Sequence, residues 1–291
     1  MAGKLTGKSA VVTGAGSTIG MGKEIALAMA AEGAKVVVND IAKDPDGTWA
    51  ADKVVSQIKK AKGTAVPNYD SVATMAGGEN IIKTAISNFG RIDILVNCAG
   101  NVIFAPITEI TESQWDAVIN VHLKGHFSCI KAAVPHMIKQ NFGRIINFSS
   151  IASLFGFGGD APSYNTVKAG IMGLTASLAA GLKAHGITAN AILPEAYTNL
   201  FPFRDRKGQA GDNMLIPQTY DADWVAPFIV YLATDEAQPI TGRFIHVAGG
   251  DICIYGQPFQ IRGETHVLIR KIGKWTVDEL IEAIPPVLGF D

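Results

Sequence analysis

The sequence predicts an α/β fold: a doubly wound parallel sheet of about seven strands in a three-layer α/β/α arrangement. Short runs rich in β-branched residues recur along the chain, and longer segments with apolar residues at helical spacing lie between them. Strands that alternate with helices form βαβ units, whose right-handed crossovers give a parallel sheet. A chain of 291 residues is long enough to bury the core of such a sheet.

Seven short β-branched runs are the predicted strands, and the segments between them are the predicted helices. The helical segments carry apolar residues at intervals of three and four. We expect strands at residues 9–13, 35–40, 64–68, 92–97, 144–148, 187–193 and 243–247, and helices at about residues 19–32, 49–62, 72–89, 113–139, 163–184 and 222–234.

Residues 1–250 contain no linker, repeat or low-complexity block, so we predict one domain there. Residues 195–222 are rich in Pro, Asp, Arg and Gly and are long for a loop, which is typical of a lid or a binding loop. In residues 251–291 the pattern THVLIRKI predicts a strand, and Thr276 with Glu279 predicts the start of a helix. We interpret this tail as an extension that covers the edge of the domain or docks on a partner subunit.

The composition excludes several classes of protein. Hydrophobic residues make up 48% of the chain and charged residues 18%, which excludes a disordered chain. The net charge of −1 gives no bulk attraction to nucleic acid or to a membrane surface. Three scattered cysteines fit neither a disulfide framework nor a zinc site, and no apolar run reaches the roughly 18 residues of a membrane span. We therefore expect a soluble, cytoplasmic protein without a metal ion.

The segment TGAGSTIGMG joins the first predicted strand to the first helix. Its glycines, among them Gly14, Gly16 and Gly20, let the backbone turn tightly and approach a pyrophosphate, which the N–H groups and the positive end of the helix stabilise. A tight turn without any ligand would need similar glycines, so this loop alone is weak evidence. Asp40 strengthens it, because a carboxylate after the second strand can accept hydrogen bonds from the ribose hydroxyls of an adenosine.

Asp40 also bears on the choice of cofactor. A carboxylate there repels a 2′-phosphate, so the sequence favours NAD over NADP. The alternative is that Asp40 only forms a turn or caps the next helix. Asp70, Ser71 and the segment NCAG (residues 97–100) end the third and fourth strands. Because the carboxyl ends of parallel strands share one edge of the sheet, we expect all these residues at the same cleft.

A second group of residues has the chemistry of proton transfer. Tyr164 and Lys168 lie four residues apart on one face of a predicted helix. The lysine ammonium favours the phenolate form of the tyrosine, whose ordinary pKa is about 10. The pair can then exchange a proton with an alcohol or a carbonyl oxygen while a nicotinamide exchanges a hydride. Ser150, after the fifth strand, can hold the same oxygen, although a tyrosine and a lysine at this spacing are common on ordinary surface helices.

The motifs TGAGSTIG and NCAG, the trio Ser150, Tyr164 and Lys168, and Pro194 together resemble the short-chain dehydrogenase/reductase family over roughly residues 5–250. The resemblance implies a Rossmann-type sheet, NAD(P)-dependent oxidoreduction of a small molecule, and a homodimer or homotetramer. It implies that the trio is catalytic and that Lys168 also binds the nicotinamide ribose. The cofactor-binding residues that it implies are Gly14, Gly16, Ser17, Thr18, Ile19, Gly20, Asp40, Asp70, Ser71, Asn97, Ala99, Gly100, Tyr164, Lys168, Pro194 and Thr198.

Departures from the family's usual pattern lie close to these residues. Thr18 stands where the family usually has glycine, so we expect its β-branched side chain to crowd the loop and to weaken cofactor binding. Glu195 replaces the glycine that usually follows the proline of the sixth strand. One extra residue before Tyr164 leaves Ser149 as a rival of Ser150 for the role of catalytic serine.

A histidine stands at a catalytic position of the fourth predicted helix. The family usually has an asparagine three residues before a glycine; counted back from Gly125, that position holds His122 and not Asn120. The resemblance is therefore to the (3R)-hydroxyacyl-CoA dehydrogenase domain of peroxisomal multifunctional enzymes, a subgroup with histidine there. It implies that His122 relays a proton or positions a water, since imidazole both donates and accepts; the alternative is a histidine packed in its helix. We expect His126 and His136 at the surface or in an oligomer contact.

The same resemblance favours a 3-hydroxyacyl-CoA, oxidised to its 3-oxoacyl form or formed in reverse, as the substrate. A free cyclic, aromatic or steroid alcohol or ketone is the alternative, for which LFPF (residues 200–203) can form an apolar wall. A third possibility is a catalytically silent nucleotide-binding regulator, against which the presence of Tyr164 and Lys168 argues. Basic residues of the loop and the tail are candidates for the phosphates of coenzyme A, although charged loop residues are usually only solvated. They are Arg204, Arg206, Lys207, Arg262 and Arg270.

Overall fold

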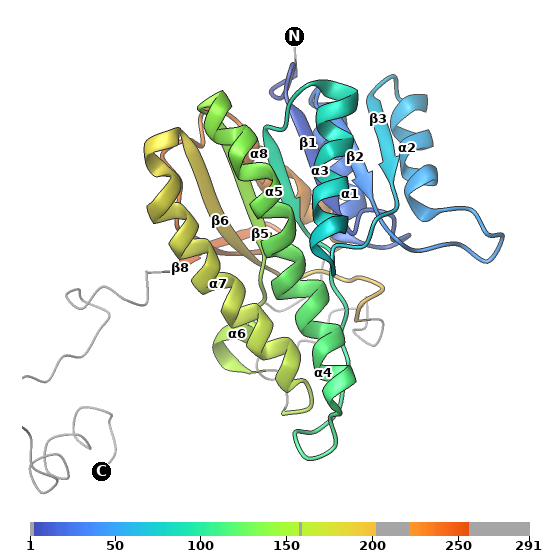
Figure 1. Ribbon diagram of the computed structural model, residues 1–291, viewed down its shortest axis with the longest axis vertical. Coiled ribbons are helices and arrows are strands. Elements are labelled where there is room, and N and C mark those ends of the chain that lie inside the picture. The colour runs from blue at the N-terminus through green and yellow to red at the C-terminus, as the bar shows by residue number, and fades with distance from the viewer. Residues whose placement is uncertain (1–2, 157–158, 202–220, 256–291) are drawn as a thin grey trace, which may run out of the picture. The chain divides into compact units, whose positions relative to one another are not determined.

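An eight-stranded sheet runs through the part of the chain that the computed structural model describes, which is residues 3–156, 159–201 and 221–255 (Figure 1). The strand order is β3-β2-β1-β4-β5-β6-β7-β8, and each neighbouring pair is parallel except β7 with β8. The order reverses between β1 and β4, which is the topological switch point of a doubly wound sheet. The strands are β1 (Ser9–Thr13), β2 (Lys35–Asn39), β3 (Thr64–Asn68), β4 (Ile94–Asn97), β5 (Gly143–Phe148), β6 (Ile187–Pro194), β7 (Phe244–Ala248) and β8 (Asp251–Tyr255).

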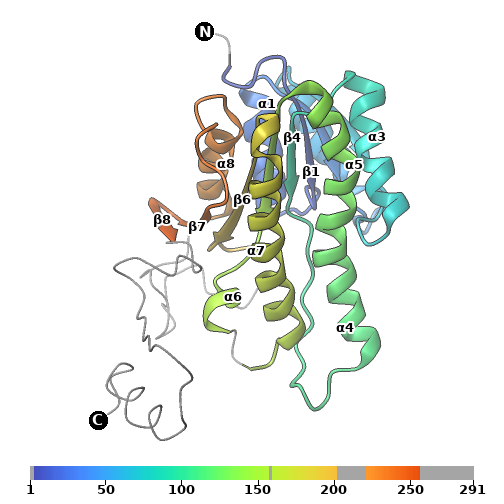
Figure 2. The same ribbon diagram turned by 60° about the vertical axis from the view of Figure 1, so that its left-hand side comes forward.

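Helices cover both faces of this sheet. Helices α3, α5 and α7 stand on one face (Figures 1 and 2) and pack with the strands into one apolar core, while α1, α2 and α8 form a second core on the other face. Parallel strands that are buried on both faces consist of apolar runs, which is why these strands can be recognised in the sequence. Among the described helices, none is long and apolar enough to cross a membrane. The helices are α1 (Met21–Ala31), α2 (Ala50–Lys60), α3 (Met75–Phe89), α4 (Glu112–Ile119), α5 (Gly125–Gln140), α6 (Ala152–Phe155), α7 (Pro162–Leu182) and α8 (Ala226–Ala233), with a π-helical segment η1 (Asn120–Lys124) and 3-10 turns η2 (Lys183–His185) and η3 (Ala222–Val225).

The predicted α/β fold class is confirmed, and each of the seven predicted strands is present within two residues of its predicted ends. The sequence does not predict β8, which pairs antiparallel with β7 and extends the sheet through Tyr255. It also does not predict the short helix α6. The predicted strand THVLIRKI, the helix start at Thr276 and most of the predicted loop at residues 195–222 lie outside the described residues.

The single helix predicted at residues 113–139 consists of three consecutive segments. It begins with a capping box in which Thr111 Oγ1 accepts the N–H of Gln114 at 3.3 Å and Gln114 Oε1 accepts the N–H of Thr111 at 2.9 Å. After α4 the helix widens into η1 and then continues as α5. A π-helical turn holds more residues than an α-helical turn and is often found at functional sites. It changes the direction of the side chains that follow.

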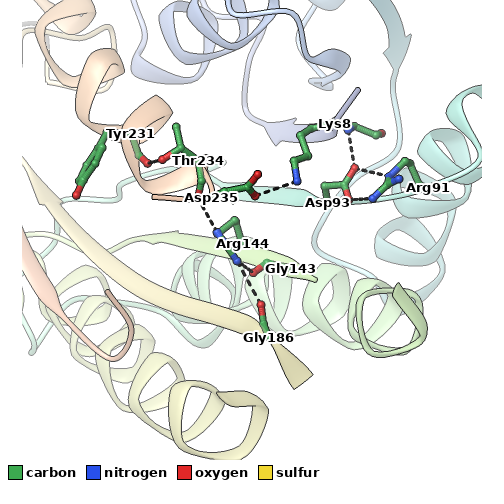
Figure 3. Close-up of polar contacts among 10 residues, drawn as sticks. Lys8, Arg91, Asp93, Gly143, Arg144, Gly186, Tyr231, Thr234 and Asp235 are labelled. Carbon is green, nitrogen blue, oxygen red and sulfur yellow. Dashed lines mark hydrogen bonds and ion pairs between the residues drawn. The ribbon is translucent and has the colours of Figure 1, made fainter. Parts of the chain in front are cut away.

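Charged and backbone groups form a network at the amino edge of the sheet (Figure 3). Arg144 on β5 is 1% exposed, and its guanidinium donates to the carbonyl oxygens of Thr234 at 3.1 Å, Gly143 at 3.0 Å and Gly186 at 3.2 Å. Burial lowers the pKa of the Arg144 guanidinium below its ordinary value. The three carbonyl groups offset part of the lost hydration. Arg144 therefore ties β5 to the chain after α8 and to the turn before β6.

A buried carboxylate supplies the second half of this amino-edge network. Asp93 accepts the N–H of Ser9 at 2.8 Å and two hydrogen bonds from the Arg91 guanidinium at 2.7 and 2.6 Å (Figure 3). Lys8, next to Ser9, donates to Asp235 at 3.0 Å. These contacts join the start of β1 to the chain before β4 and to the end of α8. The charged groups of the network at the amino edge are therefore paired within the protein.

Candidate active site

The loop between β1 and α1 needs glycine for steric reasons. Gly14 has a φ of +65°, and a β-carbon there would lie 2.6 Å from the Cα of Ala99. A β-carbon on Gly16 would lie 2.8 Å from the Cβ of Asp40, and one on Gly22 would lie 2.4 Å from the carbonyl oxygen of Gly14. The loop is therefore packed closely between the ends of β2 and β4, at the start of α1. This cradle fits the pyrophosphate of a dinucleotide.

Asp40 follows β2 and faces this loop. Its Oδ2 accepts the N–H of Gly16 at 2.7 Å, and its Oδ1 accepts the N–H of Ala42 at 2.9 Å. A carboxylate has about four lone-pair sites, so both oxygens can accept further hydrogen bonds. Asp40 thus braces the glycine loop and its own turn, and it still offers acceptors to a ribose in the adjoining cleft.

A cleft of about 580 Å³ extends along the carboxyl ends of the strands, next to the glycine loop. This volume is in the range of a cofactor site. Tyr164, Lys168 and Pro194, which the resemblance places at the cofactor, line a neighbouring pocket. The other predicted cofactor residues that line the cleft are Gly14, Gly16, Ser17, Thr18, Ile19, Gly20, Asp40, Asp70, Ser71, Ala99, Gly100 and Thr198.

Two of the cofactor expectations differ from the structure. Asn97 is buried in the sheet and outside the lining of the cleft, and its Nδ2 donates to Asn147 Oδ1 at 3.0 Å. It faces the layer of α7, where Asn147 in turn donates to Thr175 at 3.0 Å. Thr18 is exposed on the loop, so its β-branched side chain is not crowded by protein atoms. The effect of Thr18 on cofactor binding stays a prediction.

A second, smaller pocket of about 60 Å³ adjoins the cleft. Cys98, Gly100 and Thr198 line both spaces, so the pocket and the cleft share a wall. The elements that meet at the pocket are η1, the end of β5 and the first turns of α7, which lie far apart in the sequence. All four residues predicted to be catalytic line this pocket: His122, Ser150, Tyr164 and Lys168.

The two neighbouring serines differ in what their hydroxyl groups contact. Ser149 is 2% exposed, and its Oγ donates to the carbonyl oxygen of Lys168 at 2.8 Å. Ser150 Oγ accepts the N–H of Ala152 at 3.2 Å, which leaves its proton for another partner. The geometry therefore favours Ser150 over Ser149 as the serine that holds a substrate oxygen.

Lys168 is buried one helical turn after Tyr164. Its Nζ donates to the carbonyl oxygen of Phe148 at 2.7 Å and lies 5.3 Å from the centroid of the Tyr164 ring. Burial lowers the pKa of Lys168 to about 7. An ammonium has three donor protons, so the bond to Phe148 orients the side chain and leaves protons for groups that enter the pocket or the cleft.

His122 lies in η1 and is completely buried. Its Nε2 lies 2.7 Å from the carbonyl oxygen and 3.0 Å from the backbone nitrogen of Asn101. Its ring meets the Tyr164 ring edge to face at a centroid distance of 5.5 Å, and a β-carbon on Gly100 would lie 2.6 Å from its Cε1. Burial, and after it the charge of Lys168, lowers the pKa of His122 well below its ordinary value. The ring is therefore neutral, with one donor and one acceptor nitrogen.

Three other polar residues of the same helical stretch, Asn120, His126 and His136, differ in their burial. Asn120 is half-buried and lines neither the cleft nor the pocket. His136 is exposed, in agreement with the sequence. The surface position expected for His126 is wrong, because His126 is 2% exposed and its Nδ1 lies 2.7 Å from the carbonyl oxygen of His122. His126 follows His122 by four residues, and this spacing places both side chains on the buried face of the helix.

One contact of the site gives no signal in the sequence. Asn101 contacts His122 only through its backbone, which no residue type reveals. Phe201 meets the Tyr164 ring edge to face at 5.8 Å and lines the pocket. Within the described ranges, no cluster of histidine, cysteine and acidic side chains could hold a metal ion. The basic residues proposed for coenzyme A phosphates lie outside the described residues: Arg204, Arg206, Lys207, Arg262 and Arg270.

Comparisons with known proteins agree with this geometry. A family model described as enoyl-(acyl carrier protein) reductase matches residues 14–251. A putative short-chain type dehydrogenase/reductase of Mycobacterium tuberculosis is 39% identical over 249 residues, which are 83% of this chain and 82% of that protein. The peroxisomal hydratase-dehydrogenase-epimerase of Saccharomyces cerevisiae is 40% identical over 257 residues, which are 86% of this chain but 27% of that protein.

Two further relatives match over nearly their whole length. The 3-oxoacyl-[acyl-carrier-protein] reductase of Staphylococcus epidermidis is 37% identical over 250 residues, which are 84% of this chain and 98% of that protein. The crystal structure of a short chain dehydrogenase from Mycobacterium avium aligns with a TM-score of 0.82 at 37% identity, over 99% of this chain and 96% of that one. The matched region thus spans nearly all of the Staphylococcus protein and about a quarter of the yeast protein.

Proposed function

We propose that this chain, which belongs to the short-chain dehydrogenase/reductase family, oxidises a 3-hydroxyacyl-CoA to its 3-oxoacyl-CoA, or catalyses the reverse reaction, with NAD. The family and the relatives named dehydrogenase or reductase make it an NAD(P)-dependent oxidoreductase that interconverts an alcohol and a ketone of a small molecule. The observation that carries the proposal is that the four predicted catalytic residues line one pocket beside the nucleotide cleft.

Three side chains act on the substrate oxygen or on its proton. The Tyr164 hydroxyl gives a proton to the carbonyl oxygen in reduction and takes it back from the alcohol in oxidation. Lys168, one turn away, favours the phenolate by its charge, and Ser150 donates a hydrogen bond to the same oxygen. NAD, held in the cleft beside the glycine loop and Asp40, would supply the hydride chemistry at the adjacent carbon.

His122 supplies a further proton-carrying group behind the tyrosine. Its Nε2 is held by the backbone of Asn101, and its Nδ1 is buried without a hydrogen-bond partner among the described residues. The charge of Lys168 contributes to the lowered pKa of His122, so the two groups are within electrostatic reach of each other. We assign to Nδ1 the role of orienting a water or passing a proton toward Lys168.

The thioester substrate is supported by His122 and by the names of relatives. Histidine at this position is the feature by which the sequence resembles the hydroxyacyl-CoA dehydrogenase subgroup. Relatives named peroxisomal hydratase-dehydrogenase-epimerase and, in Mus musculus, peroxisomal multifunctional enzyme type 2 are 40% and 37% identical to this chain. The preference for NAD is supported by Asp40, whose carboxylate would lie beside a 2′-phosphate.

A free cyclic, aromatic or steroid alcohol is the second candidate substrate, and aromatic side chains near the catalytic tyrosine favour it. Phe201 packs edge to face on Tyr164, and Phe104 packs on Phe201 at a centroid distance of 6.3 Å. Phe104 is also an exposed side chain. These rings give an apolar wall that suits a flat ring system as well as an acyl chain.

A substrate panel tests the proposal. The purified chain is assayed with NAD and with NADP against 3-hydroxybutyryl-CoA, free 3-hydroxybutyrate, cyclohexanol and a hydroxysteroid, and formation of the reduced cofactor is followed by absorbance. We expect 3-hydroxybutyryl-CoA with NAD to give a kcat/KM at least about tenfold above the other pairs. A higher kcat/KM for the steroid or cyclohexanol would select the second candidate. No turnover in either direction by a chain that binds NADH would indicate the silent regulator.

A further inference from the structure

The turn that carries His122 is held by a side chain outside the pocket. His126 lies in the first turn of α5 and is 2% exposed. Its Nδ1 lies 2.7 Å from the carbonyl oxygen of His122, and the N–H of Gly125 also points to that oxygen. A carbonyl oxygen only accepts hydrogen bonds, so Nδ1 must carry the proton. In the neutral ring Nε2 is then a lone-pair acceptor.

The ring of His126 stays neutral in its surroundings. Burial, followed by the charge of Lys168, lowers the pKa of His126 to about 3. A neutral imidazole whose Nδ1 donates exists as one tautomer, with a lone pair on Nε2. The ring also lies close to the backbone of Asn97 at the end of β4. His126 therefore connects the π-helical turn to the strand that leads into Gly100 and Asn101.

A π-helical turn replaces the regular i to i+4 hydrogen bonds of its neighbours by i to i+5 bonds. The carbonyl of His122 instead meets the N–H of Gly125 and the ring of His126. His122 is held at its ring end by Asn101 and at its backbone end by His126. The space for its ring is narrow, because the Cε1 atom fills the volume that a side chain on Gly100 would need. A small shift of the turn would therefore break the contact of His122 with Asn101 or with Tyr164.

On the basis of the proposed function, we infer that His126 is a positioning residue: its Nδ1–H holds the carbonyl of His122 and thereby keeps the His122 ring against Tyr164. His126 lines neither the pocket nor the cleft, so its effect on the reaction passes through the turn that carries His122. Its contribution is to the turnover step, because misplacement of a catalytic group by a fraction of an ångström weakens the reaction more than it weakens binding.

Three variants separate positioning from packing. His126→Leu removes the donor at similar volume, while His126→Asn keeps a side-chain N–H that can reach the position of Nδ1. The matched control is Ser128→Ala, because Ser128 is buried in the same helix turn and bonds backbone carbonyl groups, those of Val72 at 3.0 Å and Gly125 at 2.9 Å. For each variant, kcat and KM are measured with 3-hydroxybutyryl-CoA and NAD, NADH affinity by fluorescence, and unfolding by circular dichroism.

We expect His126→Leu to lower kcat about tenfold or more, with KM and NADH affinity within about twofold of the wild type. His126→Asn should recover kcat to within about threefold, and Ser128→Ala should lower the thermal midpoint with kcat within about twofold. Equal losses in His126→Leu and His126→Asn, or a wild-type kcat in His126→Leu, would overturn the inference, since either result makes the donor unnecessary.

A spectroscopic measurement keeps this inference separate from the choice of substrate. Long-range ¹H–¹⁵N spectra of the histidine-labelled wild-type chain should show His126 as the Nδ1–H tautomer, and the His122 signals should shift in His126→Leu but not in Ser128→Ala. An Nε2–H tautomer of His126 in the wild type would refute the inference without any variant. If 3-hydroxybutyryl-CoA is not turned over while the spectra agree, the proposed substrate fails and the positioning role stands, to be measured on the alcohol that the panel identifies.

Discussion

The two edges of one sheet treat their buried polar groups in opposite ways. At the amino edge, Arg144 donates to three carbonyl oxygens and Asp93 accepts from a backbone N–H and from a guanidinium (Figure 3). At the carboxyl edge, His122 Nδ1 is buried without a hydrogen-bond partner among the described residues, and burial lowers the pKa of Lys168 to about 7. The bonded groups Arg144 and Asp93 stabilise the amino edge, whereas His122 and Lys168 line a pocket at the carboxyl edge.

This difference teaches where substitutions will have an effect. Buried polar groups that are fully hydrogen-bonded contribute to the free energy of unfolding. Removal of one partner leaves the other groups buried without a hydrogen bond, which lowers that free energy. Groups held without partners contribute little or negatively to stability, and they are concentrated at sites of chemistry. Variants at the carboxyl edge should therefore change turnover with a nearly unchanged fold, and variants at the amino edge should do the reverse.

Tyr164→Phe gives the sharpest test of the carboxyl edge. It removes the hydroxyl to which we assign the proton exchange and leaves the ring contacts with His122 and Phe201 in place. We expect a loss of about 100-fold or more in kcat, with NADH binding, measured by fluorescence, and thermal unfolding close to those of the wild type. Turnover near the wild-type rate would show that Tyr164 is not the proton donor.

Arg144→Met tests the amino edge. It keeps most of the volume and leaves the carbonyl groups of Thr234 and Gly186 without their donor. We expect the free energy of unfolding in urea to fall by about 2–4 kcal/mol, while kcat per folded molecule stays within about twofold of the wild type. The control Lys60→Met, at an exposed position of α2, should change stability by about 0.5 kcal/mol or less. A fall in kcat without loss of stability would contradict the division between the edges.

The pair His122→Ala and Asn120→Ala compares two polar residues of η1. His122 lines the pocket and packs against Tyr164, whereas Asn120 lines neither pocket nor cleft. We expect kcat to fall about tenfold or more in His122→Ala and less than about threefold in Asn120→Ala, with both variants folded by circular dichroism. The reverse order would show that the catalytic register falls on Asn120.

Asp40→Ala should have the smallest effect, on cofactor choice. Loss of the carboxylate removes the repulsion of a 2′-phosphate, so the ratio of kcat/KM for NADP to that for NAD should rise about fivefold, or ~1 kcal/mol. Asp40→Asn is the matched control, because it keeps the shape that braces Gly16 and removes the charge. The same rise in both variants would attribute the effect to charge. A wild-type chain that already prefers NADPH would refute the role given to Asp40.

Local sequence patterns predict most of this fold, because parallel strands buried on both faces leave long apolar runs between helices. The sequence does not predict β8, because only a short turn separates it from β7 and its side chains are exposed, including those of Ile252 and Ile254. Asn97 ends β4 but lies outside the lining of the cleft, since a strand-end residue can face either layer of helices. Its contact with the cofactor stays a prediction.

The glycine loop and the proton-transfer residues are predictable because each needs a fixed residue type at a fixed spacing. The π-helical turn is not, since it arises from packing between η1, α7 and the segment after β4. The backbone contact of Asn101 with His122 depends on the same packing and gives no signal in the sequence. The burial of His126 was predictable, because it follows His122 by four residues and shares its helix face.

The wall common to the cleft and the pocket limits how this protein can change. Cys98, Gly100 and Thr198 face both spaces, and Gly100 has no room for a side chain beside His122. An enlarged residue there would alter nucleotide affinity and substrate preference in the same step. Adaptation to a new substrate therefore has more freedom on the far side of the pocket, around Phe104 and Phe201, where a change leaves the dinucleotide untouched.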